Sequence, residues 1–226
     1  MNLQKVSVVI PCYNEENWIV RTVNKIFENC DVYEVLIIDD GSTDSTIKLI
    51  KELKNPNIKI ISNYVNLGKG QSLKNGFKEA NGDIIVIQDA DNEYNPEDIK
   101  EILNPFFEYN ADFVIGNRFQ PRRSRKIGYF AHTIFNRLIT NLVNIKTNKN
   151  FSDIECGYKA FRKNILDKIT LNENSFSIEV ELVIKISRIT RNIYEVGVDY
   201  HARSYEDGKK IKFSDVFKAL LCLFKY

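Results

Sequence analysis

Histidine and cysteine are scarce in this chain, and neither is spaced as the ligands of a metal usually are. The 226 residues include two histidines and four cysteines, the latter at Cys12, Cys30, Cys156 and Cys222. Because no two cysteines form a CxxC pair, the sequence argues against a zinc site. Scattered cysteines without a disulfide framework are typical of a reducing compartment, so we expect a cytoplasmic protein.

The chain also lacks an excess of either charge and any long apolar run. Its 32 basic and 30 acidic residues leave a net charge of +2, which gives no general electrostatic basis for binding nucleic acid. The apolar stretches fall well short of the ~20 residues that span a bilayer. The N-terminal residues lead straight into a strand-like run without the pattern of a signal peptide. We therefore expect a protein that is soluble or lies peripherally on the cytoplasmic face of a membrane.

What the chain does contain is a regular alternation of short apolar runs and segments with helical periodicity. With 43% hydrophobic residues it has enough apolar side chains for a substantial core. The alternation predicts a single α/β domain over residues 1–226, with helices flanking a mostly parallel, Rossmann-like sheet. The predicted strands cover residues 6–10, 35–38, 58–61, 84–87 and 113–115, and the predicted helices cover 19–27, 45–53, 72–80 and 96–109.

The second half of the chain changes character after residues 116–118. A basic loop at 122–126 precedes a helical pattern whose apolar face includes Ile127, Phe130, Ile134, Leu138 and Val143. A turn-rich segment at 147–158 follows, then a predicted helix at 178–189 and a strand at 193–198. Residues 213–224 repeat the helical spacing and predict a C-terminal amphipathic helix.

Acidic residues follow three of the predicted strands, in the segments 11–16, 39–44 and 88–93. In a parallel sheet ligands bind beyond the carboxyl ends of the strands, so these segments are expected to meet in one crevice. Carboxylates gathered there would repel one another and raise their own pKa values unless a cation compensates them. The sequence therefore predicts a divalent metal, Mg²⁺ or Mn²⁺, in this crevice.

The segment Asp89-Ala90-Asp91 is the centre of this expectation. An extended backbone places Asp89 and Asp91 on one side and Ala90 on the other. Carboxylate oxygens together with phosphate oxygens suit a hard cation on a diphosphate, and Glu93 is a further candidate ligand. Taken alone, the pattern reads better as an acidic turn before the helix that Asn95 caps and Pro96 begins. Its position after a buried strand, beside two other acidic strand ends, favours the metal.

Two further segments suit a nucleotide. Asp39 and Asp40 stand at a strand end, where a carboxylate can accept hydrogen bonds from a nucleobase or a ribose. Residues 66–70 precede a helix, and there glycine allows the backbone to approach a phosphate while Lys69 supplies charge. The P-loop pattern GxxxxGK[ST] is absent, so this is a weak signal on its own.

Seven segments in fixed order make the chain resemble family-2 glycosyltransferases of the GT-A fold, within the branch of the dolichyl-phosphate mannose and glucose synthases. They are PCYNE at 11–15, DDGSTD at 39–44, NLGKG at 66–70, QDAD at 88–91, GNR at 116–118, DIECGYKAF at 153–161 and RSYEDGKK at 203–210. The resemblance implies an inverting transfer of a hexose from a UDP- or GDP-linked sugar. It also implies a donor-binding half, 1–117, and an acceptor-binding half, 118–226.

The resemblance carries roles onto particular residues of this chain. The donor is expected to contact Pro11, Tyr13, Glu15, Asp39, Asp40, Lys69, Asp89, Ala90 and Asp91. The metal is expected on Asp91 and Glu93. The predicted catalytic residues are Asp89, Asp91, Asp153, Arg203 and Lys209, with Arg203 and Lys209 closing over the diphosphate. An anionic acceptor is expected at Arg118, Arg122, Arg123, Ser124 and Arg125.

The identity of the acceptor stays open. An arginine-rich loop beside two apolar helical faces favours a polyprenyl phosphate at a membrane surface, although the same faces suit two ordinary core helices. A saccharide hydroxyl is the alternative acceptor and needs a base, for which Asp153, with Glu181 behind it, is the candidate. A non-catalytic nucleotide-binding module is the remote alternative. No nucleic-acid partner is expected.

Overall fold

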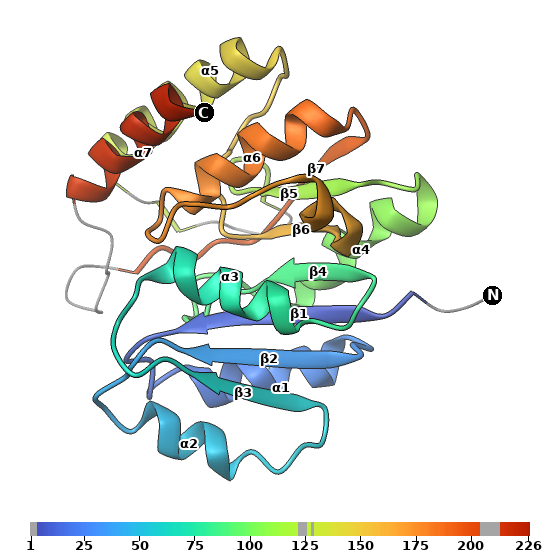
Figure 1. Cartoon of the computed structure of the whole chain (residues 1–226), viewed down its shortest axis with the longest axis vertical. Helices are drawn as coiled ribbons and strands as arrows, with labels where there is room; N and C mark the ends of the chain where they lie inside the picture. The colour runs from blue at the N-terminus through green and yellow to red at the C-terminus, as the bar shows by residue number, and fades with distance from the viewer. Residues whose placement is uncertain (1–3, 122–125, 128, 204–212) are drawn as a thin grey trace.

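Seven strands form one sheet in the order β3-β2-β1-β4-β6-β5-β7 (Figure 1). The computed structural model describes residues 4–121, 126, 127, 129–203 and 213–226, and gives only the backbone for 213–217. The strands are β1 (Val6–Cys12), β2 (Glu34–Asp39), β3 (Ile58–Ser62), β4 (Ile84–Ile87), β5 (Phe113–Asn117), β6 (Lys159–Arg162) and β7 (Ile193–Gly197). All neighbouring strands are parallel except β6, which runs antiparallel to β4 and β5. The mostly parallel α/β sheet is therefore confirmed.

Helices cover both faces of this sheet, with α3 in front of it and α1 behind it in Figure 1. α5, α6 and α7 pack against one another beside the β5–β7 end. The helices are α1 (Ile19–Asn29), α2 (Thr46–Glu52), α3 (Lys69–Glu79), α4 (Ile99–Glu108), α5 (Phe130–Thr147), α6 (Ile178–Ile189) and α7 (Phe213–Lys225), with the short 3₁₀ turns η1 (Pro96–Asp98) and η2 (Lys163–Lys168).

The periodicity of the sequence placed the first five strands and all four predicted helices of the first half. Their ends differ by three residues or fewer from those of the structure. The cap at Asn95 is also confirmed, since its side chain accepts a hydrogen bond from the backbone of Glu97. α3 begins one turn earlier than predicted, because Gly68 at φ 93° lets the chain enter the helix at Lys69.

The sequence analysis missed β6. Its four residues carry Lys159 at one end and Arg162 at the other, so no apolar run marks it as a strand. β6 nonetheless lies inside the sheet, between β4 and β5, which places a strand of the second half of the chain between two strands of the first. The two halves therefore share one sheet and one core.

α5 buries only part of the face that its apolar pattern indicates, and buries two polar residues as well. Its buried residues are Asn136, Ile139, Thr140 and Val143, whereas Phe130, Ile134 and Leu138 are exposed. The polar pair faces inward because the Asn136 amide donates to the buried Asp153 carboxylate and the Thr140 hydroxyl accepts from the backbone of Ile154. An apolar stripe is thereby left on the outside of the helix.

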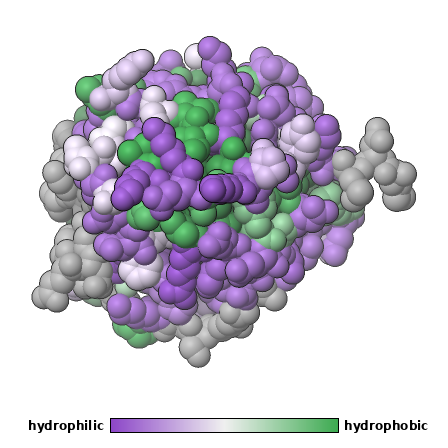
Figure 2. All heavy atoms as spheres, turned by 90° about the horizontal axis from the view of Figure 1, so that it is seen from below, coloured by the Kyte–Doolittle hydropathy of each residue, from purple (hydrophilic) through white to green (hydrophobic). Residues whose placement is uncertain are grey.

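The free edge of the sheet at β3 is also partly apolar. Seen from that side, hydrophobic residues gather at the centre of the molecule's face, within a hydrophilic surround (Figure 2). Ile58, Ile60 and Ile61 of β3 are only half-buried there. Lys59, which pairs with Glu79, places a charge on this edge, and such charges discourage other strands from adding to it.

α3 lies close to the sheet because a glycine faces the strands. A Cβ on Gly76 would stand 2.4 Å from a methyl carbon of Val9 and 3.1 Å from a side-chain carbon of Ile38. The helix that carries Lys69 is thus held against β1 and β2, which fixes its first residue relative to the strand ends.

We expect Gly76→Ala to lower the free energy of unfolding by roughly 1–2 kcal/mol, although alanine is the better helix former. The overpacking of about 1–3 kcal/mol outweighs the helix-propensity gain of about 1 kcal/mol. Urea unfolding followed by circular dichroism measures the change. Lys78→Ala, at an exposed position of the same helix, is the control and should change stability by less than about 0.5 kcal/mol. Greater stability of Gly76→Ala than of the wild type would contradict this packing.

Candidate active site at the carboxyl ends of the strands

The acidic segments meet at one edge of the sheet, as the strand order requires. β1 lies between β2 and β4, so the residues that follow these three strands are neighbours in space. Asp39 is the last residue of β2 and pairs with Cys12 at the end of β1. Asp89 and Asp91 follow β4, and Glu15 follows β1. Most of these side chains are buried or nearly so, which makes their charges costly unless they are compensated.

Arg203 compensates several of these carboxylates at once. Its Nη2 stands 2.6 Å from Asp91 Oδ2, and its Nη1 stands 3.3 Å from Glu15 Oε2. Its backbone N–H donates to Glu93 Oε1 at 2.7 Å, and Glu93 also accepts from the hydroxyl of Tyr200. The prediction that Arg203 closes over a diphosphate stays a prediction; in the structure it cross-links the ends of β1 and β4.

One guanidinium does not balance the carboxylates around it. Burial, followed by repulsion from Asp89 and Glu93, raises the pKa of Asp91 to about 7, and attraction to Arg203 offsets only part of this. Additional positive charge nearby would stabilise the ionised form of such a carboxylate. The position of Asp91 therefore suits a divalent cation.

The described residues fit such a cation only in part. Across residues 4–121, 126–127, 129–203 and 213–226, no three His, Cys, Asp or Glu side chains are grouped as a ready set of metal ligands. Asp91 and Glu93 both lie on the segment after β4, and the backbone N–H of Glu93 donates to Asp91 Oδ1 at 3.1 Å. This donor set fits a metal that takes further ligands from a bound diphosphate, as Mg²⁺ commonly does.

Asp89 is held by a different cation. Lys69 Nζ stands 2.6 Å from Asp89 Oδ1 and 2.8 Å from Glu179 Oε1. On its other side Asp89 meets the backbone of Gly157, where an added Cβ would lie 2.4 Å from Asp89 Oδ2. Ala90, between the two aspartates, is buried, and its carbonyl accepts from Thr22. Asp89 and Asp91 are thus separately paired although they lie two residues apart.

Asp40 has a structural partner for each of its oxygens. The carboxylate accepts from the backbone N–H groups of Leu67 and Gly68 at 3.0 and 2.8 Å, and from the Asn63 amide at 2.8 Å. It therefore holds the loop that leads into Lys69. Asp39, which is 4% exposed, accepts from the backbone of Ser42 at 3.3 Å. Donor contact by either aspartate stays a prediction.

The glycines of residues 66–70 serve the packing of the chain on itself. The Gly70 backbone N–H donates to the carbonyl of Asn174 at 2.9 Å, and that carbonyl lies 2.4 Å from where a Cβ on Gly68 would stand. The loop before α6 therefore covers the start of α3. Close packing against Asn174 therefore explains the glycines at these positions without a phosphate. The Lys69 side chain still reaches the site.

Arg118, which is partly exposed, and the fully buried Asp153 form a two-point ion pair. Arg118 Nε and Nη2 donate to the two oxygens of Asp153 at 2.7 Å each, and Asn136 donates a further hydrogen bond at 2.6 Å. Burial acts to raise the pKa of Asp153, but the Arg118 charge and these hydrogen bonds hold it below its ordinary value. Glu181 is not part of this group, because its carboxylate accepts from the backbone of Asn172 and Glu173.

Some predicted site residues lie outside the described part of the chain. These are Arg122, Arg123, Ser124, Arg125 and Lys209. Pro11 and Tyr13 are described and partly buried at the end of β1, next to Glu15. The roles of all of them remain predictions.

Sequence reasoning missed several residues that support the site. The Tyr158 hydroxyl donates to Gln88, and the backbone of Gly157 donates to the Tyr94 hydroxyl at 2.8 Å, so two buried tyrosines brace the segment that carries Asp89. Glu179 and Lys159 were missed as well. Lys159 lies in the segment 153–161 that carries the resemblance, but nothing in the sequence pairs it with Glu179, which is one of four charged residues in α6.

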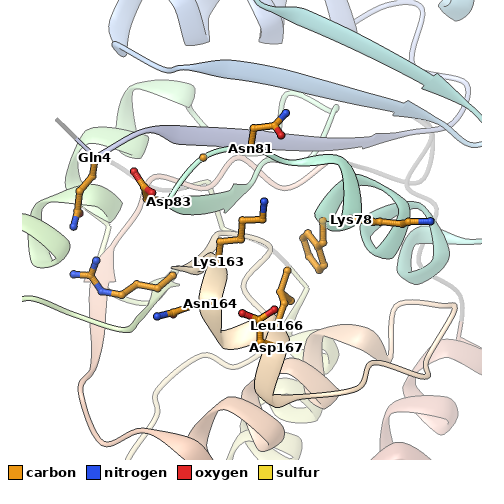
Figure 3. Close-up of a pocket in the computed structure, with 11 residues that line it drawn as sticks. Gln4, Lys78, Asn81, Asp83, Lys163, Asn164, Leu166 and Asp167 are labelled. Atoms are coloured by element: carbon orange, nitrogen blue, oxygen red, sulfur yellow. The ribbon is translucent and has the colours of Figure 1, made fainter. Parts of the chain in front are cut away.

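A hollow of about 640 Å³ opens at the opposite ends of the parallel strands, where these strands begin. Figure 3 shows Lys163 and Asp83 at this hollow, with Asp167 and Lys78 also around it. Cations and carboxylates alternate along its wall without converging on one point. We assign this hollow no part in the chemistry of the strand ends.

Comparison with known proteins gives one family. Residues 7–170 match the model of the family described as glycosyl transferase family 2. The chain is 32% identical over 216 residues to the undecaprenyl-phosphate 4-deoxy-4-formamido-L-arabinose transferase of Proteus mirabilis (strain HI4320), across 92% of this chain and 63% of the relative. It is 28% identical over 219 residues to the dolichol-phosphate mannosyltransferase of Pyrococcus furiosus, across 92% and 60%. The chain thus spans less than two thirds of the length of these relatives.

The fold is shared with solved structures. Glucosyl-3-phosphoglycerate synthase from Mycobacterium tuberculosis, solved with Mn²⁺, UDP and phosphoglyceric acid, gives a TM-score of 0.75 at 19% identity, over 98% of this chain and 78% of that one. The same enzyme with Mg²⁺ and UDP gives 0.76 at 20% identity, over 98% and 79%. At this identity the likeness establishes the GT-A type of fold and nothing finer.

We expect Asp153→Asn to lower the free energy of unfolding by about 3–5 kcal/mol, because Arg118, whose side chain is only 18% exposed, then lacks its charge partner. Arg118→Met/Asp153→Asn should recover most of this loss. The pKa of Asp153 is lower in the folded chain than its ordinary value of about 3.9, so its contribution is present above that pH and is lost as the pH falls through the lowered value. Urea unfolding at several pH values should show the gap between wild type and Asp153→Asn closing below about pH 4. A gap that is unchanged in acid would contradict the ion pair.

Proposed function

The chain belongs to glycosyl transferase family 2, and we propose that it transfers a sugar from a nucleoside-diphosphate sugar to a polyprenyl phosphate. The observation that carries this proposal is the convergence of Glu15, Asp89, Asp91 and Glu93 at the carboxyl ends of β1 and β4, beside two protein cations. The names of the two relatives include an arabinose derivative and mannose, so the proposal leaves the class of sugar open.

The donor fits the crevice at the ends of β1, β2 and β4. Asp39 lies where a nucleobase or ribose would be bound, beside the segment of Pro11 and Tyr13. Asp89 would face the sugar, with Lys69 next to it. Lys69 and Arg203 supply positive charge where the leaving diphosphate gains negative charge, and this kind of stabilisation is often the largest part of catalysis.

A divalent metal would be held by Asp91 and Glu93. The solved neighbours contain Mn²⁺ or Mg²⁺ together with UDP, and the raised pKa of Asp91 indicates a place for positive charge in this chain. When bound, the metal would neutralise charge on the diphosphate. The side chains of Glu15 and Arg203 would then shift to make room for the metal at Asp91.

The reaction needs one substitution at the anomeric carbon. An acceptor phosphate oxygen forms the new bond to this carbon while the bond to the nucleoside diphosphate breaks, and attack opposite the leaving group inverts the configuration. A phosphate monoester has a second pKa of about 6, so it attacks without a base at neutral pH. Both oxygens of Asp153 are occupied by Arg118, which favours this acceptor over a hydroxyl that needs a base.

The outer surface of α5 and α7 suits contact with a lipid surface. Phe130 and Ile145 of α5 are 77% and 80% exposed, and Phe224 of α7 is 78% exposed. The two helices pack against each other, and Arg137 and Lys218 are exposed on them. Within the described residues no helix has the length and apolarity to cross a membrane. We therefore propose peripheral attachment, with apolar side chains in the interface and cations toward anionic headgroups.

The transfer reaction tests the proposed function directly. Purified protein is incubated with polyprenyl phosphate, Mn²⁺ and labelled UDP- or GDP-sugars, and lipid-soluble label is counted. We expect transfer from one donor type, and a loss of at least about 100-fold in Asp91→Asn, because a main source of leaving-group stabilisation is removed. Glu79→Gln, at the exposed end of α3, is the matched control and should keep wild-type activity. Absence of transfer with every donor would contradict the proposal.

Vesicle binding tests the proposed attachment. We expect Phe130→Ser/Ile134→Ser to weaken sedimentation with anionic vesicles roughly tenfold or more, since two apolar side chains no longer enter the interface. Tyr64→Ser removes a fully exposed aromatic side chain elsewhere and should bind as the wild type does. Equal binding of both variants would show that α5 is not the contact surface.

A further inference from the structure

Glu179 lies in the first turn of α6, is almost fully buried and has no role in the function proposed above. We infer that it is a positioning residue, which fixes the Lys69 ammonium and thereby the orientation of the Asp89 carboxylate toward the donor. The inference rests on the proposed function, since it assigns how one carboxylate of that site is held.

Four charges of alternating sign form a continuous chain through the interior. Asp89 Oδ1 is 2.6 Å from Lys69 Nζ, Lys69 Nζ is 2.8 Å from Glu179 Oε1, and Glu179 Oε2 is 2.5 Å from Lys159 Nζ. The exposed side-chain fractions fall inward from 21% for Asp89 to 0% for Lys159. Only the Asp89 end of this chain of charges opens toward the crevice.

The two carboxylates that form ion pairs with Lys69 determine where its ammonium lies. A lysine with one carboxylate partner has a flexible stem and a point charge that tolerates many geometries. Lys69 is held between Asp89 and Glu179, and the Phe176 ring lies 5.6 Å from its Nζ. Glu179 thus stops the ammonium from moving with the Asp89 side chain, so that Asp89 is held by a fixed partner.

Glu179 is itself attached to the strand that leads to the site. Its partner Lys159 begins β6 and is paired with Ile87, the last residue of β4. Asp89 follows Ile87 by two residues and is closed in from the other side by Gly157. The Asp89 carboxylate therefore lies between the backbone of Gly157 and the Lys69 ammonium. Glu179 and Lys159 connect that ammonium to β6, which pairs with β4, the strand before Asp89.

A purely structural role for Glu179 predicts a different outcome. In that case Glu179 serves only to neutralise the buried Lys159, and Lys69 needs no second partner. Glu179→Leu leaves Lys159 uncompensated and lowers the melting temperature under either role. Glu179→Leu/Lys159→Met removes both buried charges together, and such replacement of an ion pair by apolar side chains usually keeps the fold.

The experiment compares wild type, Glu179→Gln and Glu179→Leu/Lys159→Met by melting temperature and by kcat and KM for the donor. We expect the double variant to melt near the wild type and both variants to lose about 10- to 100-fold in kcat, as expected for a small misplacement of a reacting group, with a smaller change in KM. Glu79→Gln serves again as the control. A wild-type kcat in either folded variant would overturn the inference.

Crystal structures of the wild type and the double variant separate this inference from the proposed function. We expect Lys69 Nζ and the Asp89 carboxylate to move from their wild-type positions when Glu179 is absent. Unmoved side chains would overturn the positioning role even if the wild type transfers no sugar. A wild type without transfer activity but with the expected displacement would contradict the proposed function alone.

Discussion

The burial of several carboxylates beside one another is the constraint on which the rest of this structure depends. Parallel strands bring their carboxyl ends to one edge, and each of β1, β2 and β4 delivers acidic residues there. Two cations compensate these carboxylates, and each contacts two of them: Arg203 contacts Glu15 and Asp91, and Lys69 lies between Asp89 and Glu179. The compensation is incomplete at Asp91, whose pKa is raised.

Residue patterns along the sequence were sufficient for every strand of the sheet except β6, and for the composition of the crevice. Continuous apolar runs mark strands buried on both faces, and the rule that ligands bind beyond the carboxyl ends of such strands then brings Asp39, Asp89 and Asp91 together without any coordinates. The helix cap at Asn95 follows from local chemistry in the same way. These predictions depend on neighbours along the chain, which a sequence displays directly.

What the sequence did not reveal depends on partners far apart along the chain. β6 has no apolar run because its ends carry Lys159 and Arg162. Lys159 is tolerated in the interior because Glu179 balances its charge and the carbonyl of Cys156 accepts a further hydrogen bond. α5 turns Asn136 inward because its amide donates a hydrogen bond to the buried Asp153, which a hydropathy pattern cannot indicate. The sequence likewise offered no means of telling that Asp40 would be engaged by a loop.

The contacts that Arg203 makes with the ends of β1 and β4 have a consequence for the order in which the molecule folds. This arginine contacts Asp91 across 112 residues and Glu15 across 188. Contacts of such separation form late, and a chain made from its N-terminus presents the acidic strand ends well before this partner exists. The nascent β1, β2 and β4 therefore assemble against their own electrostatic repulsion, and the final segments of the chain complete the charge balance of a site that the first segments began.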